Sequence, residues 1–318
     1  MHLAVSLNNA SADGQSTGLG FGHLVKFVQS AEAAGIDMVV ISDSTDQLSS
    51  SPFEATTLLA ALATVTESIG LVASASTFAH QPYNLARRFA SLDIISHGRI
   101  GWNATLAQNP REAANFSRPE GIADEDFRRR AEEFIGIVQG LWRGWDADAL
   151  LFDKAGGRFH DPEKMHFLDH KGEFFSVRGP LNVARSPQDL PVLVMSGLAE
   201  ADRDFAAKVA DVVLIEADGA GAAYGDLKRR AVAAGREPET MKVLMPVGVN
   251  NLAAGEAEGW FDTKSCDGFN LALPADLSLL DHFTDRILPE LRRRGLARST
   301  YAGATLRDRL GLGAGGEK

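Results

Sequence analysis

Eight short apolar runs constrain the fold of this chain more than any other feature. They cover residues 3–7, 37–42, 69–77, 99–103, 191–196, 211–217, 241–249 and 267–273. Each run is almost continuously apolar, which indicates a strand buried on both faces, as in parallel sheets covered by helices. Helical periodicity fills most of the gaps between the runs. Eight such units predict a closed (β/α)8 TIM barrel, with a doubly wound open sheet as the alternative.

The alternation is interrupted once, between the fourth and fifth units. Residues 146–190 are rich in glycine, aspartate and histidine and contain only short β-like pieces. We interpret them as an insertion that covers one mouth of the barrel. We expect residues 1–310 to form a single barrel domain and the glycine-rich residues 311–318 to be a flexible tail.

Composition excludes several classes of protein. Of the 318 residues, 32 are Lys or Arg and 42 are Asp or Glu, so the net charge is −10. A nucleic-acid-binding protein normally carries a basic face, and we expect none here. No apolar stretch reaches the length of a membrane helix, and no secretory leader is recognisable. The single cysteine, Cys266, forms no internal disulfide and fits a reducing compartment, so we expect a cytoplasmic protein.

The carboxyl ends of barrel strands are where ligand-binding side chains gather. A buried strand has no use for an asparagine unless something at its end requires one. Structural alternatives stay open, because Asp43 could cap a turn, Asn103 could satisfy loop backbone and His80 could merely enter a helix. The rule selects Asp43 after the second run, Ser76, Thr77 and His80 after the third, Trp102 and Asn103 at the end of the fourth, and Ser196 and Gly197 after the fifth.

Other familiar motifs do not fit. The segment GAGAAYG at 219–225 has its third glycine one residue too late for the dinucleotide fingerprint, and no nucleophile elbow occurs. We therefore expect no metal and no dinucleotide. Histidine and acidic residues in the insertion have a spacing that suits no usual metal site: His160, Asp161, Glu163, His166 and His170.

The segment HQPYNLARRFASLDIISHGRIGWN, residues 80–103, resembles the signature of the bacterial-luciferase-like flavin monooxygenases. It is most similar to the branch that oxidises nitrilotriacetate, dibenzothiophene sulfone and long-chain alkanes. Further similar segments follow in the family order and cover most of the chain: residues 131–142, 161–181, 187–213, 267–271 and 305–312.

The resemblance implies a (β/α)8 barrel that binds reduced FMN at its carboxyl-terminal mouth. A separate flavin reductase would supply the FMN, and O2 would oxygenate a small organic or organosulfur compound. By position, Asp43 would lie near the isoalloxazine ring, Ser76 and Thr77 would approach it from strand three, and Asn103 would hydrogen-bond to it. A homodimer or homotetramer and a cis peptide bond near Ser74–Ala75 are also implied.

The chain departs from this pattern at the expected phosphate ligands. Ala199 and Asp202 replace a serine and a glycine after strand five, where Ser196 and Gly197 begin the loop. The histidine and tyrosine of the pattern fall on Asp124 and Arg128, or on Phe127 if one residue is gapped. Glu200 and Asp202 lie near the start of the helix that follows this loop and would repel a phosphate, although Arg128 could compensate.

Three functions therefore compete. The first is an FMN-dependent monooxygenase with altered phosphate contacts and His80 as the best candidate for a catalytic group. The second is a related oxidoreductase with a deazaflavin cofactor, which would need a basic phosphate pocket. The third is a flavin-binding protein without turnover, because only residues 250–266 remain where relatives carry a long insertion. The substrate is not encoded in any motif of this chain.

Overall fold

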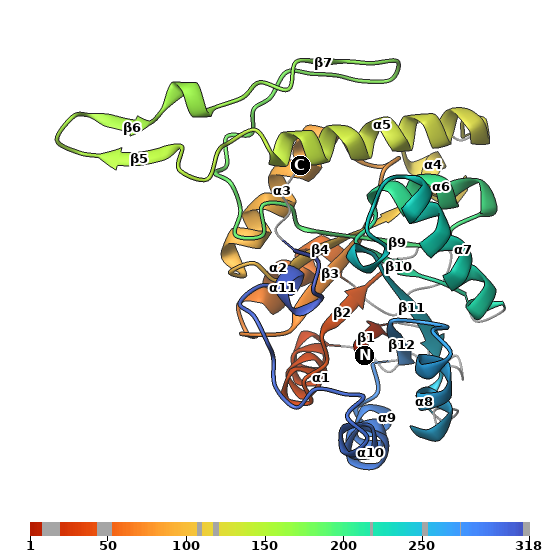
Figure 1. Cartoon of the computed structure of the whole chain (residues 1–318). Coiled ribbons are helices and arrows are strands. Elements are labelled where there is room, and N and C mark those ends of the chain that lie inside the picture. Colours follow the sequence, from red (N-terminus) through yellow and green to blue (C-terminus); the bar gives the residue numbers. More distant parts are fainter. Residues whose placement is uncertain are drawn as a thin grey trace.

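A computed structural model describes residues 1–7, 20–42, 53–106, 110–116, 121–216, 219–249, 254–273 and 275–313. Eight parallel strands form a closed barrel in the order β1-β12-β11-β10-β9-β4-β3-β2, as Figure 1 shows. This confirms the predicted (β/α)8 barrel over the open sheet. The strands are β1 (His2–Leu7), β2 (Met38–Ile41), β3 (Gly70–Ser76), β4 (Ile100–Thr105), β9 (Val192–Ser196), β10 (Val212–Leu214), β11 (Lys242–Val247) and β12 (Gly268–Leu273).

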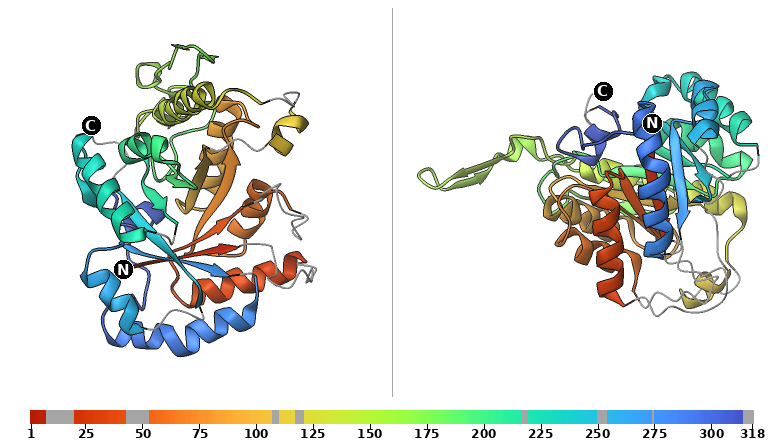
Figure 2. Two further views of the ribbon diagram at one scale, coloured as in Figure 1. Left: turned by 90° about the vertical axis from the view of Figure 1, so that its right-hand side faces the viewer. Right: turned by 90° about the horizontal axis from the view of Figure 1, so that it is seen from below.

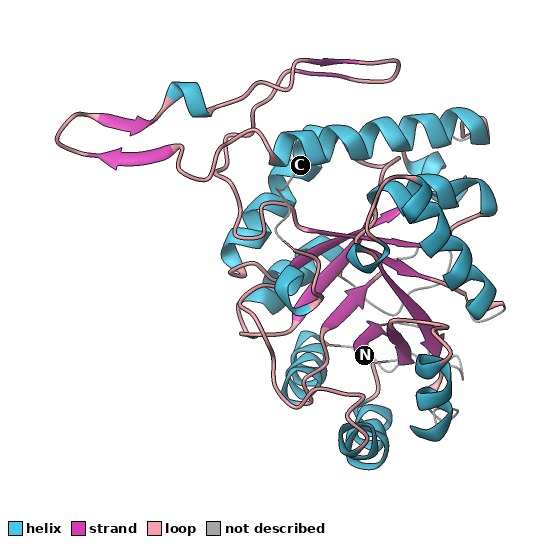
Figure 3. Ribbon diagram, in the orientation of Figure 1, coloured by secondary structure: helices cyan, strands magenta, loops and turns pink. Residues whose placement is uncertain are grey.

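Helices surround the strands, as the colouring by secondary structure in Figure 3 makes clear. The longest, α5 (Asp124–Trp142), packs beside α3 (Pro82–Ile95). The others are α1 (Phe21–Ala33), α2 (Ala55–Ala63), α4 (Pro110–Asn115), α6 (Arg203–Val209), α7 (Ala220–Ala233), α8 (Ala254–Asp262), α9 (Leu277–His282), α10 (Leu288–Arg293) and α11 (Leu306–Arg309). A π-helix, η5 (Phe283–Ile287), joins α9 to α10, and short 3-10 helices are η1 (Pro162–Lys164), η2 (Glu200–Asp202) and η3 (Pro238–Thr240).

The apolar runs are buried on both faces because each strand separates two cores. One core lies between the strands and the helices and contains most of the large side chains. The other core fills the barrel interior, and the last helix, α11, contributes to it. Its members are Ala4, Met38, Val40, Val72, Val192, Val194, Val212, Leu214, Leu244, Leu306, Leu310 and Leu312.

Helix α11 packs against the amino-terminal ends of β3 and β4. The Leu306 backbone N–H donates to the Gly98 carbonyl at 2.8 Å, and a Cβ on Gly70 would lie 2.5 Å from Leu306 Cδ1. Glycine at position 70 therefore makes room for the leucine. The Arg307 guanidinium pairs with Asp211 at 2.6 Å and fixes the same helix to the start of β10. This end of the barrel is closed by apolar packing.

Asp93 ties three of these elements together. Its carboxylate is fully buried and accepts hydrogen bonds from the Ile100 backbone N–H and from the Gln188 side chain and backbone N–H. Burial raises the pKa of Asp93 above its ordinary value. Gln188 Oε1 in turn accepts from the Arg307 N–H at 2.9 Å. Hydrogen bonds through Asp93 and Gln188 therefore connect β4 to α11 at the amino-terminal end of the barrel.

The insertion does not cover a barrel mouth as expected. Helix α5 returns the chain to the amino-terminal ends of the strands, so the residues between α5 and β9 leave the barrel at the end opposite the predicted site. Strands β5 (Leu150–Asp153) and β6 (Arg158–His160) pair with each other as a hairpin, which we call the arm. Figure 1 and the right panel of Figure 2 show the arm extending away from the barrel.

Helix α3 ends at Ile95, with Ser96 at the C-cap. His97 and Gly98 follow in the left-handed region with φ of 57° and 84°, and the Gly98 N–H donates to the Asp93 carbonyl at 2.8 Å. The Ser74–Ala75 bond is not cis, contrary to the expectation, because β3 continues regularly through it with Ser74 beside Asn103 and Ala75 beside Ala104. No helix in the described ranges is both long and apolar enough to span a bilayer.

Replacing Leu310 by alanine tests the seal. Leu310 is fully buried in the interior core, so Leu310→Ala should lower the free energy of unfolding by about 2–5 kcal/mol in urea denaturation. The control Val232→Ala, at a position 57% exposed on α7, should change it by less than about 0.5 kcal/mol. Equal, small effects for the two variants would show that α11 does not seal the barrel.

Candidate functional site

A hydrogen-bonded polar cluster lies inside the barrel near the carboxyl ends of β3, β4 and β9. Asn103 Nδ2 donates to Ser74 Oγ at 2.9 Å and to Ser196 Oγ at 3.1 Å. The Ser196 hydroxyl also lies 3.1 Å from Asn103 Oδ1 and can donate to it. Asn103 is 4% exposed and Ser74 is 6% exposed. The predicted Asn103 and Ser196 are brought together here, and we call these three residues the Asn103 cluster.

A second polar pair lies on β1 and β12, where Ser6 Oγ donates to Asn270 Oδ1 at 3.0 Å. The site residues predicted from the sequence do not include Ser6, Ser74 or Asn270. The sequence does contain a signal for these residues. Strand residues two apart share a face, so one position that faces the barrel interior predicts the next interior position along the strand. Ala4 precedes Ser6 in this way, and Val72 precedes Ser74. The interior therefore changes from apolar to polar towards the carboxyl end.

Trp102 does not belong to the site, contrary to the prediction that paired it with Asn103. Its side chain is fully buried in the core between the strands and the helices, and its Nε1 donates to the Ala75 carbonyl at 3.0 Å. Adjacent strand residues point to opposite faces, which separates the two side chains. Trp102 packs near aromatic rings of the surrounding helices, those of Phe89, Phe134 and Trp142.

The predicted residues after β3 are held by their own loop. Ser76 Oγ accepts from the backbone N–H groups of Phe78 and Ala79 at 3.1 and 3.3 Å. His80 Nδ1 lies 3.0 Å from the Ser76 carbonyl and must donate to it, which leaves Nε2 as the acceptor of the neutral ring. Thr77 is fully buried, and its Oγ1 donates to the Thr105 carbonyl at 3.3 Å. These contacts fix the loop at the mouth.

Helix α5 supports this loop from outside. Arg130 donates to the Thr77 carbonyl at 2.7 Å, and its guanidinium lies 4.7 Å from the centre of the Phe175 ring. Phe175 belongs to the turn between β7 (His170–Lys171) and β8 (Ser176–Val177), a second hairpin of the insertion. Glu133 holds this hairpin by accepting from the backbone N–H groups of Phe174 and Phe175 and from His170 Nε2. The insertion thus supports the mouth from outside through its second hairpin.

An ion pair with one buried partner joins the loop after β9 to α5. Asp202 Oδ1 accepts from Arg128 Nε at 3.0 Å, and Asp202 Oδ2 accepts from the Ala199 backbone N–H at 3.1 Å. The Asp202 side chain is 7% exposed, whereas that of Arg128 is 37% exposed. Gly197 begins the loop with a φ of 63°, in the left-handed region that favours glycine. Arg128 therefore neutralises Asp202, which partly offsets the repulsion expected at this helix start.

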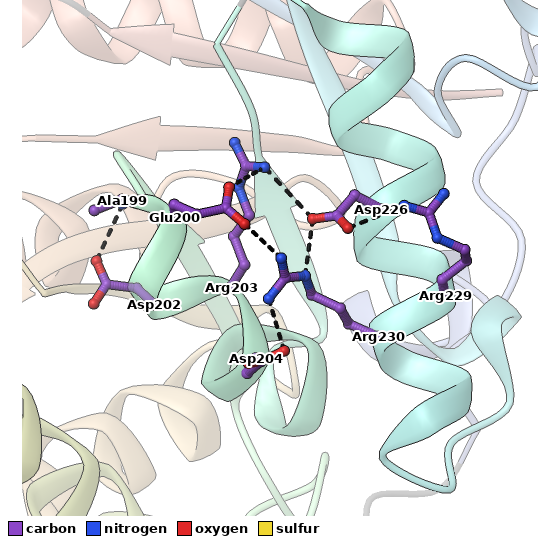
Figure 4. A network of polar contacts seen from close by, with 8 residues as sticks. All are labelled: Ala199, Glu200, Asp202, Arg203, Asp204, Asp226, Arg229 and Arg230. Atoms are coloured by element: carbon purple, nitrogen blue, oxygen red, sulfur yellow. Dashed lines mark hydrogen bonds and ion pairs between the residues drawn. The ribbon is translucent and has the colours of Figure 1, made fainter.

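Figure 4 shows that Glu200 is neutralised as well. Its carboxylate lies 2.7 Å from Arg203 and 2.5 Å from Arg230. Arg230 also pairs with Asp204 and Asp226, each at 2.8 Å, and so joins η2 and α6 to α7. The arginines of this network are engaged by protein carboxylates. They form a charged connection between neighbouring helices.

Asp43 lies outside the described residues, so its predicted position near a ligand stays a prediction. Among the residues that the structure describes, no group of three or more His, Cys, Asp or Glu side chains could hold a metal ion. The described part of the mouth offers neutral hydrogen-bonding groups inside the barrel and a neutralised ion pair beside it. Such a site suits an organic ligand with both donor and acceptor atoms.

Comparison with known proteins gives matches over nearly the whole chain. A family model described as luciferase-like monooxygenase matches residues 1–251. Nitrilotriacetate monooxygenase component A of Aminobacter aminovorans is 35% identical, over 80% of this chain and 78% of that protein. One of the pristinamycin IIA synthase subunits of Streptomyces pristinaespiralis is 36% identical, over 95% and 93%. The crystal structure of a long-chain alkane monooxygenase has the same fold, with a TM-score of 0.90 and 21% identity over 99% of this chain and 96% of that one.

Replacing Glu133 by glutamine tests how the second hairpin is held. Burial alone would raise the pKa of Glu133, but hydrogen bonds from His170, Phe174 and Phe175 lower it below the ordinary value. A carboxyl whose pKa is lower in the folded than in the unfolded state stabilises the fold at any pH above its unfolded-state pKa, about 4.3 for Glu. This stabilisation is lost as the pH falls through the folded-state pKa. Glu133→Gln should therefore cost about 1–3 kcal/mol in urea denaturation at pH 7 and less at pH 3.

Glu173→Gln is the matched control, because Glu173 lies on the same hairpin and forms an exposed ion pair with Arg129 of α5. It should change the free energy of unfolding by less than about 0.5 kcal/mol at pH 7. A cost for Glu133→Gln that does not diminish at low pH would contradict the lowered pKa.

Proposed function

Because the chain belongs to the luciferase-like monooxygenase family, as residues 80–103 predict, we propose that it uses reduced FMN and O2 to oxygenate a small organic or organosulfur compound. The observation that carries this proposal is the Asn103 cluster, a buried polar site at the mouth of a barrel whose other end is sealed. Reduced flavin supplies two electrons, so that one atom of O2 enters the substrate and the other leaves as water.

The donor set fits the flavin ring system. The polar edge of an isoalloxazine ring carries both N–H and carbonyl groups, and the Asn103 amide with the Ser196 hydroxyl offers both an acceptor and donors. Beneath this cluster the interior is apolar, with Val72 and Val194 from the same strands. Asn103 and Ser196 would therefore hold and orient the ring, and the apolar layer would exclude water from below it.

The residues around the mouth would complete the site. We propose that His80 contacts the ligand through Nε2, because the Ser76 carbonyl engages the other ring nitrogen. Ser76 and Thr77 would act by shaping the loop that carries His80, since their hydroxyls bind loop backbone. Asp43 is retained as a ring contact on the family resemblance alone.

A flavin reductase is the partner that this chemistry requires. The nitrilotriacetate relative is named as component A, and the pristinamycin relative is named as one part of a synthase, which supports a system of more than one protein. The pristinamycin relative matches over 93% of its own length, so a chain of about this size is named as part of a synthase. We further propose a cytoplasmic homodimer or homotetramer.

Anaerobic titration with reduced FMN tests the proposal. Asn103→Ala removes hydrogen bonds to the ring and should raise the Kd for reduced FMN at least about tenfold, the effect of roughly 1.4 kcal/mol. Ser196→Ala should raise it by a smaller factor, and it guards against a folding defect in the asparagine variant. Asn84→Ala, on the exposed face of α3, is the control and should leave the Kd unchanged. Failure of the wild-type protein to bind any flavin would refute the proposed function.

A further inference from the structure

Resting on the proposed function, we propose that the Asp202 carboxylate occupies the anion position beside the flavin ring, so that the protein recognises its flavin without the phosphate. The protein would then accept riboflavin as readily as FMN. Asp202 is thus a specificity-determining residue that selects for the ring and against a charged tail.

The loop after β9 is where a phosphate would be expected. In α/β proteins, cofactor phosphates bind beyond the carboxyl end of a strand, against the backbone N–H groups that begin the next helix. Ser196 is both a member of the Asn103 cluster and the last residue of β9, so this loop starts at the proposed ring site. Among the described residues, and apart from the chain neighbours of Gly197, no atom lies within 4 Å of a Cβ placed on this glycine.

One backbone donor of this loop and the neighbouring Arg128 of α5 are already engaged by a protein anion. One Asp202 oxygen accepts from the Ala199 N–H and the other from Arg128 Nε, at 3.1 and 3.0 Å. These are a backbone amide and a guanidinium, the two kinds of donor that phosphates prefer. Position 199 is itself an alanine, which has no side-chain donor. A phosphate at the Asp202 position would compete with this carboxylate for the Ala199 N–H and for Arg128 Nε.

Displacing Asp202 would be costly. Its side chain is 7% exposed, and a buried carboxylate that loses its partner is strongly destabilising. If Asp202 stayed, the phosphate would lie beside a like charge. Glu132, whose pKa is raised by burial and by Asp202 against the opposing effect of Lys208, adds another acid near the same pair. The electrostatics of this loop disfavour a second anion.

The neighbouring arginines do not change this balance. Arg203 pairs with Glu200 and Asp226, and Arg230 pairs with Glu200, Asp204 and Asp226. Their charges are therefore offset by carboxylates of η2, α6 and α7, as Figure 4 shows. A neutral ribityl tail, which offers only hydroxyl groups, meets no such repulsion. The loop is thus suited to a flavin with an uncharged tail.

Comparing two ligands tests the inference. The Kd values of the wild-type protein for reduced FMN and reduced riboflavin are measured anaerobically in the same buffer, and we expect them to agree within about threefold. Binding of FMN at least tenfold tighter than riboflavin would overturn the inference but leave the proposed function standing. Binding of neither flavin would overturn both.

The variant Asp202→Asn then opens the anion position. The amide oxygen keeps the hydrogen bond from Ala199, while Arg128 loses its charged partner. We expect FMN binding to tighten about tenfold, with riboflavin affinity unchanged and with a new weakening of FMN binding as salt is raised. Thermal unfolding checks that the variant is folded, and equal effects on the two flavins would contradict the inference.

Asp204→Asn is the matched control. It removes the same charge at the start of the same helix, but Asp204 is 80% exposed and pairs with Arg230 rather than Arg128. It should change the affinity for either flavin by less than about twofold. A gain in FMN affinity as large as that of Asp202→Asn would show that net charge, and not the occupied anion position, sets the preference.

Discussion

The change from apolar to polar side chains along the barrel interior is the constraint on which the rest of the structure depends. A buried amide or hydroxyl is tolerated only where its hydrogen bonds are made, and Asn103, Ser74 and Ser196 make them with one another. The apolar half must then be closed, which α11 does with its leucines. The hydrogen bonding of these three side chains and the packing of α11 at the other end therefore both follow from the change from apolar to polar side chains along the interior.

Helix α5 coordinates the mouth because its side chains point in several directions within two turns. Arg128 reaches the loop after β9, Arg130 reaches the loop after β3, and Glu133 holds the second hairpin of the insertion. Residues two and three apart on a helix point about 200° and 300° around its axis, so neighbouring charges serve different elements. A single helix thereby determines the relative positions of two loops that come from strands far apart in sequence.

Local pattern predicts the barrel well and the site only in part. Continuous apolar runs specify strands buried on both faces, and the position of Asn103 near the end of one of them pointed to the interior. Strict alternation along the strand would also have assigned Trp102 to the helix layer and revealed Ser6, Ser74 and Asn270. The pairing of Arg128 with Asp202 joins residues 74 positions apart, and no local pattern reports such a contact. The direction of the arm likewise depends on where α5 ends in space.

The arm leaves the barrel at the end away from the Asn103 cluster, so changes to the arm are made far from the proposed ligand site. The turn of the arm contains Gly156 and Gly157, which are both exposed. Among the described residues, the strands of the arm pair only with each other. Exposed turns of this kind accept insertions and covalent labels with little effect on the packed domain. The turn is therefore a suitable position for attaching a fluorophore or an immobilisation tag without altering the proposed site at the opposite end of the barrel.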